Sequence, residues 1–382
     1  MLLARATSSC TRTTSRTTTR EVGMTAMVVF GGPSPEHDIS ILTGLQAART
    51  LTGGGVPVMA LYWAKSGSWY EVDPGLEAVD FSEGAPPRSK SVDFRAQPGG
   101  GFWRGRRRLE ASVVLNACHG GPGEDGTLQS ALDLAGLRYT GPGAAASSLG
   151  MDKLAFGALM AHLGIPTIPR LPVEKEPPPF DPPYIIKPRF GGSSIGIEIV
   201  GDFATATRLV ETSPHLRGGA VVEPFMVGSR DVNVAVRTYP ELELSALEAP
   251  ARSPEASIYG YTEKYLSGGG LEGSQRELPA QVPEAVAESI RSYARVVTHE
   301  AGLRSVARID FLVQDERVWV NEVNTIPGSL AAYLWIDPPI TRLELLRGML
   351  AEAERRPPRA FMIAGADGTA LRSAASIAQK LG

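Results

Sequence analysis

Two short polar segments near the carboxyl end of the chain carry residue types suited to catalysis. They read RID and NEVN in single letters. Side chains two residues apart on a strand point to the same face. Arg308 therefore lies on the same face as Asp310 if the first segment is extended. The same spacing places Glu322 with Asn324 in the second segment.

If these two strands pair, one face of a sheet collects two carboxylates, one amide oxygen and one guanidinium. Oxygen ligands of this kind suit Mg²⁺, which keeps several waters and bridges the phosphates of a substrate. Arg308 would then lie where negative charge develops on the reacting group. A solvated face with ordinary ion pairs is the alternative interpretation, because structural networks of charges are common.

A second candidate feature lies near the middle of the chain. Lys187 follows an apolar run and precedes the small-residue loop Gly191-Gly192-Ser193-Ser194. Backbone N–H groups of such a loop can bind phosphate oxygens, and the lysine can neutralise them. The spacing is not that of a P-loop. Lys153 is a second candidate, although a lysine on a helix usually faces solvent.

The elements that must position these residues follow from apolar runs and loop signals. Strand, loop and helix alternate in the first part, which predicts a parallel α/β domain with function at the carboxyl ends of its strands. A stiff, extended connection is expected over 166–183, and an edge region or surface excursion over 82–108. Strands are predicted at 27–30, 111–117, 184–187, 196–200, 221–223, 232–237, 306–313 and 317–323, and helices at 39–51, 128–135, 151–163, 283–301 and 370–381.

Composition limits the class of protein. The chain has 382 residues, 43% of them hydrophobic and 21% charged, with a net charge of -3. This balance predicts a soluble globular protein and gives no basic surface for nucleic acid. Two cysteines, Cys10 and Cys118, cannot form a disulfide framework, which suits a reducing compartment. No apolar run approaches the length of about 20 residues that a membrane helix needs, so we expect a cytoplasmic location.

The first 23 residues are rich in Thr, Ser and Arg and contain no acid before Glu21. Such a segment cannot build a core, and we expect residues 1–26 to be disordered. A start assigned too early, with Met24 or Met27 as the true start, is the preferred explanation. A targeting peptide is the alternative.

Several stretches resemble the D-alanine–D-alanine ligase family of the ATP-grasp superfamily. The order of Lys153, Lys187 with its loop, Glu223 and the carboxyl-terminal trio resembles the superfamily as a whole. The stretches that resemble the ligase family are FGGPSPEHDIS at 30–40, HGGPGEDGTLQ at 119–129, GMDKLAF at 150–156, IIKPRFGGSSIG at 185–196, EKYLS at 263–267, ARIDF at 307–311 and NEVNTIPG at 321–328.

The resemblance implies a fold and a reaction. The fold class is α/β, with an α+β character in the ATP-grasp part. The implied divisions are a leader at 1–26, an amino-terminal α/β domain at 27–143, a central ATP-grasp lobe at 144–228, a carboxyl-terminal lobe with the metal site at 229–355 and a tail at 356–382. The implied reaction activates one D-alanine through an acylphosphate made from ATP, and the amine of a second D-alanine then attacks it. Two Mg²⁺ or Mn²⁺ ions are expected.

The resemblance also implies roles for single residues. Glu36 would hold the ammonium of the first amino acid, although an acid there also complements the dipole of the following helix. Ser193 and Tyr265 match the residues that hydrogen-bond with this glutamate and close the site. Arg308 and the N–H of Gly328 match the oxyanion-stabilising groups. The nucleotide would be bound by Lys153, Lys187, Glu223, Phe225, Met226, Asp231 and Lys264, and the metal by Asp310, Glu322 and Asn324.

Several positions leave alternatives open. Asp231 falls where the family usually has a glutamate, with a one-residue difference in length, and Phe225 and Met226 also suit an ordinary core. His119 either lines the first amino-acid site or is a satisfied structural residue, and Glu124 matches the same part of the family pattern.

The sequence departs from the family pattern after Gly328. By counting, Tyr333 takes the place of a serine that binds the carboxylate of the second amino acid. Tyr265 is typical of members that form a dipeptide, but a different second substrate stays open. A nucleotide-binding module without activity is the alternative from another class, and the intact set of charged residues argues against it. A homodimer is expected from the resemblance alone.

Overall fold

The computed structural model describes residues 24–251, 276–374, 376 and 377. Its first part is a seven-stranded sheet in the order β6-β5-β4-β3-β2-β1-β7. Strands β1, β2 and β7 are parallel, in agreement with the predicted parallel α/β domain, although no strand was predicted over β2. The strands from β2 to β6 form an antiparallel meander. The bounds are β1 Ala26–Gly31, β2 Val58–Trp63, β3 Trp69–Val72, β4 Lys90–Arg95, β5 Gly101–Arg104, β6 Arg107–Arg108 and β7 Val113–Asn116.

The meander corrects the interpretation of residues 82–108. They lie at the edge of the sheet but are not a surface excursion, because β4, β5 and β6 continue the sheet. Aromatic side chains hold this extension together: the rings of Phe94 and Phe102 stack at 4.5 Å, and Trp69 meets Phe102 edge to face at 5.1 Å. Stacked and edge-to-face pairs stabilise neighbouring strands beyond the area they bury.

Helices cover the amino-terminal sheet and lead to the next lobe. Five elements fill this part: α1 His37–Gly53, the 3₁₀ helix η1 Ala78–Phe81, α2 Gly121–Glu124, α3 Thr127–Ala135 and α4 Ala144–Met151. The helix predicted over 151–163 is wrong at its start, because Asp152 interrupts it. The Asp152 carboxylate accepts hydrogen bonds from the backbone N–H groups of Leu154 and Ala155, and so caps α5 (Lys153–His162). Such a cap fixes the first turn of a helix.

The central lobe is a small antiparallel sheet in the order β10-β9-β11-β8. Its elements are β8 Leu171–Pro172, β9 Tyr184–Pro188, β10 Glu198–Val200, α6 Phe203–Thr212, the 3₁₀ helix η2 Pro214–Leu216 and β11 Ala220–Pro224. A separate apolar cluster that includes Tyr184, Ile186, Leu216 and Val222 forms the core of this lobe.

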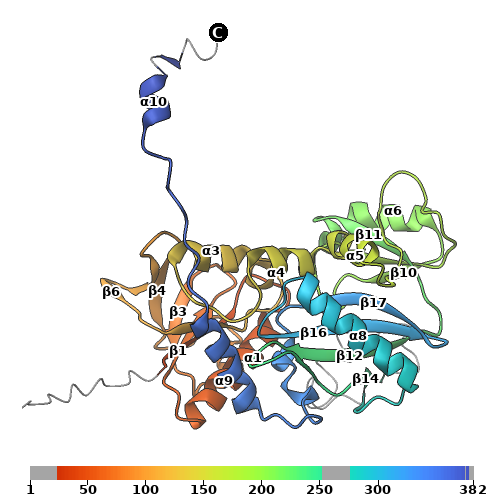
Figure 1. Cartoon of the computed structure of the whole chain (residues 1–382), viewed down its shortest axis with the longest axis horizontal. Helices are drawn as coiled ribbons and strands as arrows, with labels where there is room; N and C mark the ends of the chain where they lie inside the picture. The colour runs from red at the N-terminus through yellow and green to blue at the C-terminus, as the bar shows by residue number, and fades with distance from the viewer. Residues whose placement is uncertain (1–23, 252–275, 375, 378–382) are drawn as a thin grey trace, which may run out of the picture.

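The carboxyl-terminal lobe is a four-stranded sheet in the order β13-β12-β16-β17, and α8 lies across one face of it (Figure 1). Residues 306–314 and 317–324 form the hairpin that the sequence predicts. The elements are β12 Arg230–Arg237, β13 Glu243–Leu244, the paired strands β14 Ala249–Pro250 and β15 Arg276–Glu277, α8 Glu284–Glu300, β16 Val306–Gln314, β17 Arg317–Asn324 and the 3₁₀ segment η4 Gly328–Leu334.

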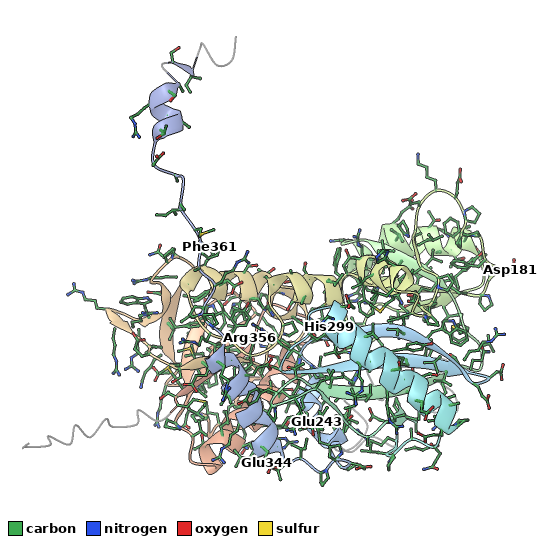
Figure 2. All side chains as sticks on the ribbon, viewed as in Figure 1. Asp181, Glu243, His299, Glu344, Arg356 and Phe361 are labelled. Atoms are coloured by element: carbon green, nitrogen blue, oxygen red, sulfur yellow. The ribbon has the colours of Figure 1, made fainter. Side chains whose placement is uncertain are left out.

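The last helix of the globular part, α9 (Arg342–Arg355), returns to the amino-terminal domain. Its apolar face, which includes Leu346 and Leu350, belongs to the same core as Phe30 of β1 and Leu51 of α1. Figure 2 labels Glu344, in the first turn of α9, and Arg356, just beyond its end.

Beyond Phe361 the tail leaves the body of the molecule and carries the short helix α10 (Thr369–Ser373) (Figures 1 and 2). The sequence predicts a helix in the tail over 370–381, of which Ala375 and residues 378–381 lie outside the described part. None of the helices in the described ranges is both long enough and apolar enough to cross a bilayer.

The contact between α1 and β1 allows a sharp test of packing. A Cβ atom at Gly44 would lie 2.4 Å from the Cβ atom of Phe30. Gly44→Ala is therefore expected to lower the free energy of unfolding by about 1–3 kcal/mol through overpacking. Gly53→Ala, at the end of the same helix, meets no atom within 4 Å and is the control. Its effect should stay within about 1 kcal/mol. Urea unfolding measures both, and equal effects would contradict this packing.

Candidate active site

The β16–β17 hairpin brings the four catalytic candidates together as predicted. Arg308 is paired in register with Asn324, and Asp310 with Glu322. The Arg308 guanidinium donates two hydrogen bonds of 2.7 Å to the Asp310 carboxylate, and Asn324 Nδ2 donates one of 3.0 Å. Burial alone would lower the pKa of Arg308, but the Asp310 carboxylate raises it well above its usual value. Arg308 is thus a fixed positive charge on this face.

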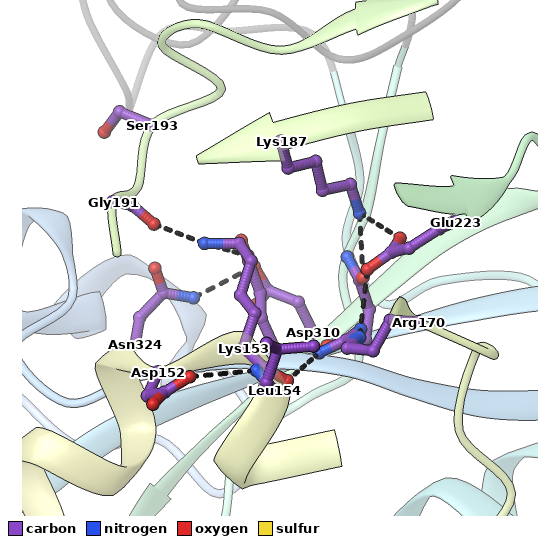
Figure 3. A network of polar contacts seen from close by, with 12 residues as sticks. Asp152, Lys153, Leu154, Arg170, Lys187, Gly191, Ser193, Glu223, Asp310 and Asn324 are labelled. Carbon is purple, nitrogen blue, oxygen red and sulfur yellow. Dashed lines mark hydrogen bonds and ion pairs between the residues drawn. The ribbon is translucent and has the colours of Figure 1, made fainter. Parts of the chain in front are cut away.

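Lys153 reaches the same face from the start of α5. Its ammonium lies 3.9 Å from Glu322 Oε2 and donates a 2.5 Å hydrogen bond to the carbonyl of Gly191. Its side chain is only 7% exposed, so the interpretation as a solvated helix lysine is wrong. Burial lowers its pKa, and the Glu322 carboxylate opposes this shift. Figure 3 shows how Lys153 lies between Gly191, Asp310 and Arg170.

Lys187 projects from β9 toward β11. Its ammonium donates a 2.7 Å hydrogen bond to Glu223 Oε2 and lies 3.4 Å from Asn321 Oδ1 of β17. Burial would raise the pKa of Glu223, but the charges of Lys187 and Arg170 hold it below its usual value. Arg170 was not singled out from the sequence. It lies in the proline-rich connection before β8, where no motif or periodicity marks it.

A cavity opens between the central and carboxyl-terminal lobes. One part of its lining is apolar and includes Ile185, Phe225 and Met226, and the other part is charged and includes Lys187 and Arg308. An apolar slot next to buried cations suits a flat base joined to phosphates. The predicted nucleotide residues Glu223 and Asp231 and the metal residues Asp310 and Glu322 also line it.

A second cavity shares Arg308 and Glu322 with the first and is lined by Glu36, Lys153, Ser193, Asn324 and Gly328. The Ser193 hydroxyl donates a hydrogen bond to Glu36 Oε1, as predicted. Glu36 occupies the N-cap position of α1, but its side chain makes no capping hydrogen bond. A Cβ atom at Gly120 would lie 2.4 Å from Glu36 Oε2, so only glycine allows this approach. Lys264 and Tyr265 lie outside the described residues.

Both ring nitrogens of His119 lie within hydrogen-bond distance of a partner. Nδ1 lies 2.7 Å from the carbonyl of Ile326, and Nε2 lies 2.8 Å from the Thr43 hydroxyl. Burial lowers its pKa to about 4, so the ring is neutral. His119 lines the second cavity, and its two bonds also make it a structural link between the amino-terminal domain and the segment after β17.

Glu124 makes a second link between the same segments. Its carboxylate accepts hydrogen bonds from the backbone N–H of Gly120 and of Ile326, both at 2.9 Å, and from the Thr325 hydroxyl at 3.1 Å. Burial, together with the nearby charge of Glu36, raises its pKa from 4.5 to about 7.

The raised pKa gives a prediction about stability. Between pH 4.5 and about 7 the folded protein holds a proton on Glu124 that the unfolded chain has lost. The contribution of Glu124 to stability therefore falls as the pH rises through this window, by about 3 kcal/mol. Glu124→Gln removes this change. Urea unfolding of both proteins at several pH values gives the difference curve, and a difference that is flat or rises with pH would contradict the assignment.

The turn after Gly328 is unusual. Ser329, Leu330 and Ala331 all adopt positive φ values near 50°. Consecutive left-handed residues other than glycine are strained, and such strain gathers at functional sites. The turn buries Leu330 and Ala331, and it brings Tyr333 to Glu248, the residue before β14.

Tyr333 joins a buried polar group there. Its hydroxyl donates to Glu248 Oε2 at 3.3 Å, and the Arg276 guanidinium lies 4.4 Å from the centre of its ring. Arg276 also donates a 2.8 Å hydrogen bond to Glu248 Oε1. The hydroxyl therefore has a protein partner at the position where the sequence suggested a substrate carboxylate.

The donor set fits a divalent ion that protein and phosphate hold jointly. Asp310 and Glu322 supply two carboxylates from adjacent strands, and Asn324 supplies an amide oxygen. Within the described ranges, no group of three or more His, Cys, Asp or Glu side chains could hold a metal ion. Mg²⁺ often takes only one or two carboxylates and completes its shell with water and phosphate oxygens. The set thus suits Mg²⁺ together with a nucleotide.

Comparisons with known protein families cover most of the chain. A family model described as the D-ala D-ala ligase N-terminus matches residues 25–142, and one described as the D-ala D-ala ligase C-terminus matches residues 159–336. A D-alanine–D-alanine ligase of Mycobacterium sp. (strain KMS) is 30% identical over 360 residues, covering 86% of this chain and 96% of the relative. One of Mycobacterium tuberculosis (strain CDC 1551 / Oshkosh) is 31% identical over 363 residues, covering 86% and 95%.

Solved structures show the same fold. D-alanyl-alanine synthetase A of Vibrio cholerae superposes with a TM-score of 0.71 at 24% identity, covering 87% of this chain and 99% of the other. The VanG D-Ala:D-Ser ligase of Enterococcus faecalis gives a TM-score of 0.71 at 22% identity with the same coverage.

Proposed function

The chain belongs to the D-alanine–D-alanine ligase family, and we propose that it joins two D-alanines to D-alanyl-D-alanine with ATP, for peptidoglycan precursor synthesis. The observation that carries the proposal is that two cavities share Arg308 and Glu322. One has the apolar slot and buried cations that suit a nucleotide. The other has the Glu36 carboxylate, which suits an ammonium group.

The first half of the reaction is phosphoryl transfer. The carboxylate of the first D-alanine attacks the γ-phosphorus of ATP, the bond to the β,γ-bridging oxygen breaks, and ADP leaves with an acylphosphate formed. Lys153 and Lys187 neutralise charge on the phosphates, and Glu36 holds the ammonium of the substrate in place. Catalysis of this step is mainly positioning and neutralisation of charge. Mg²⁺, when bound at Asp310, Glu322 and Asn324, supplies further neutralisation of phosphate charge.

The second half is acyl transfer. The neutral amine of the second D-alanine attacks the activated carbonyl, the bond from the carbonyl carbon to the phosphate oxygen breaks, and the departing phosphate takes up the proton that the amine loses. Negative charge develops on the carbonyl oxygen in this step. Arg308 and the backbone N–H of Gly328 would stabilise it, because fixed donors in a buried site need no reorganisation.

We also propose two bound Mg²⁺ or Mn²⁺ ions, a homodimer and a cytoplasmic location. Their support is the membership of the family, as the sequence analysis set out. Size-exclusion chromatography with light scattering tests the dimer, and a monomer at micromolar concentration would contradict it.

The test of the activity measures phosphate release from ATP with and without D-alanine, and the product by mass spectrometry. We expect release to depend on D-alanine and D-alanyl-D-alanine to form. Nucleotide binding without any stimulation by D-alanine would favour the non-catalytic module instead.

A different second substrate is the alternative that one observation favours. Tyr333 stands in place of the family's serine, its hydroxyl donates to Glu248, and Arg276 lies over its ring. The same assay with D-alanine held constant and D-serine, D-lactate or other D-amino acids added decides between them. If D-alanine and the competitor are present at equal concentrations and the mixed product exceeds D-alanyl-D-alanine, the proposed specificity for two D-alanines is contradicted. The proposed ligase mechanism is not affected by that result.

A further inference from the structure

Arg170 lies at the back of the candidate nucleotide site, although it comes from the connection before β8. Its side chain is 3% exposed. The guanidinium donates from Nη1 to the carbonyl of Lys153 at 3.0 Å and from Nη2 to the carbonyl of Asn321 at 2.9 Å. Nε lies 3.0 Å from Glu223 Oε1 (Figure 3). One planar group thus contacts α5, β17 and β11.

Each of these three contacts lies next to a residue with a proposed role. Lys153 itself is a phosphate lysine, Asn321 precedes Glu322, and Glu223 pairs with Lys187. A guanidinium has a rigid fork of donors that can hold three partners at fixed angles, which an ammonium on a flexible stem cannot do. Arg170 therefore fixes the relative positions of groups that come from both ATP-grasp lobes.

Arg170 also acts as a counter-ion of Glu223. Glu223 is 1% exposed and lies between two cations, Arg170 and Lys187. If Lys187 turned toward a phosphate, a buried carboxylate without another partner would be left uncompensated, which costs several kcal/mol. Arg170 keeps Glu223 paired throughout, so Lys187 can change partner.

The contact between Arg170 and Glu223 is an ion pair and not a hydrogen bond. No hydrogen bond from the described residues reaches Glu223 Oε1, because its 3.0 Å contact with Arg170 Nε lacks hydrogen-bond geometry. Glu223 lines the first cavity next to Phe225. Arg170 thus balances the charge of Glu223 through proximity, without a hydrogen bond to Oε1.

We propose that Arg170 is a positioning residue of the nucleotide site: it is the permanent counter-ion of Glu223 that releases Lys187 to bind phosphate, and it holds Lys153 in place beside β17. This inference rests on the proposed function only in that the ligand is a nucleoside polyphosphate. It concerns binding and does not depend on which substrates are joined.

The test compares Arg170→Met and Arg170→Lys with Arg208→Met, which removes an exposed arginine of α6 in the same lobe. Isothermal calorimetry with Mg²⁺ and without D-alanine measures the binding of adenosine, ADP and the non-hydrolysable analogue AMP-PNP. Binding is measured at a temperature well below the thermal unfolding midpoints of all variants, so that all of them are folded.

We expect Arg170→Met to weaken the binding of ADP and AMP-PNP by about 10- to 100-fold. The binding of adenosine should weaken by much less, because the effect runs through Lys187 and Lys153. Arg170→Lys should restore part of the loss, since it keeps the charge but not the fork. Arg208→Met should bind all three as the wild type does.

Two outcomes would overturn the proposal. One is that folded Arg170→Met binds AMP-PNP within threefold of the wild type. The other is that adenosine and ADP weaken equally, which is the result of a loosened pocket. If Arg170→Met does not fold, Arg170→Lys is used alone. A larger loss of affinity for ADP than for adenosine then supports the proposal, and an equal loss contradicts it. A wild-type protein that binds nucleotide but makes no dipeptide would contradict the proposed function and leave this test intact.

Discussion

Glu322→Gln is expected to lower D-alanine-dependent phosphate release by about 1,000-fold in a protein that still folds. Glu322 faces Asp310 across the hairpin and lies 3.9 Å from the ammonium of Lys153. The amide keeps the shape of the side chain but removes the charge that a divalent ion and a phosphate lysine require. Loss of one such electrostatic group in a buried site typically costs a factor of about 100–1,000. Stopped assays of phosphate release measure the loss.

The control for this variant lies in the same hairpin. Glu316 is exposed in the turn between β16 and β17, and Glu316→Gln should leave both activity and stability unchanged. The Glu322 side chain is 23% exposed, so its replacement should shift the thermal midpoint by only a few degrees. Activity of Glu322→Gln within tenfold of the wild type would remove this residue from the metal site.

Arg308→Lys is expected to lower kcat by about 100- to 1,000-fold. Lysine keeps the positive charge, but it cannot make the two parallel hydrogen bonds that Arg308 gives to Asp310. Its ammonium would shift, and the donor aimed at the developing oxyanion would be lost. Because this contact forms mainly in the transition state, kcat should fall more than the KM for ATP rises.

Steady-state kinetics with ATP and D-alanine varied in turn check this split. Arg317→Lys, an exposed change at the start of β17, is the matched control. If Arg308→Lys raised the KM for ATP and left kcat unchanged, Arg308 would serve nucleotide binding alone, and the oxyanion role would be wrong.

The strand pair that carries the proposed metal ligands was predictable because its geometry is local. A period of two residues fixes which side chains share a face, and a hairpin of two residues, Asp315 and Glu316, fixes the register. This register alone would pair Asp310 with Asn321. A β-bulge between Asp310 and Phe311 shifts it by one residue and places Glu322 opposite Asp310, which the sequence did not predict. The sequence indicated Lys153 and Lys187 as candidate phosphate-binding residues. It could not show that they are buried, because their burial depends on lobes that meet only in the folded chain.

Other features needed tertiary information. Arg170 lies among prolines, and its three partners are 17, 53 and 151 residues away in the sequence. The strands β4 to β6 were missed because they are short and half exposed, so an alternating apolar pattern hardly develops. Whether His119 is structural could not be decided from sequence, because both partners of its ring come from distant segments.

The place of α9 has a consequence for the order of folding in the cell. Leu346 and Leu350 complete the apolar interior around β1 and α1, yet the family model for the amino-terminal part already ends at residue 142. At about 5–20 residues per second, a ribosome needs on the order of 10–40 s more to reach α9. During that time the nascent domain exposes the apolar surface that α9 will cover. The domain that is translated first is therefore among the last to complete its apolar core.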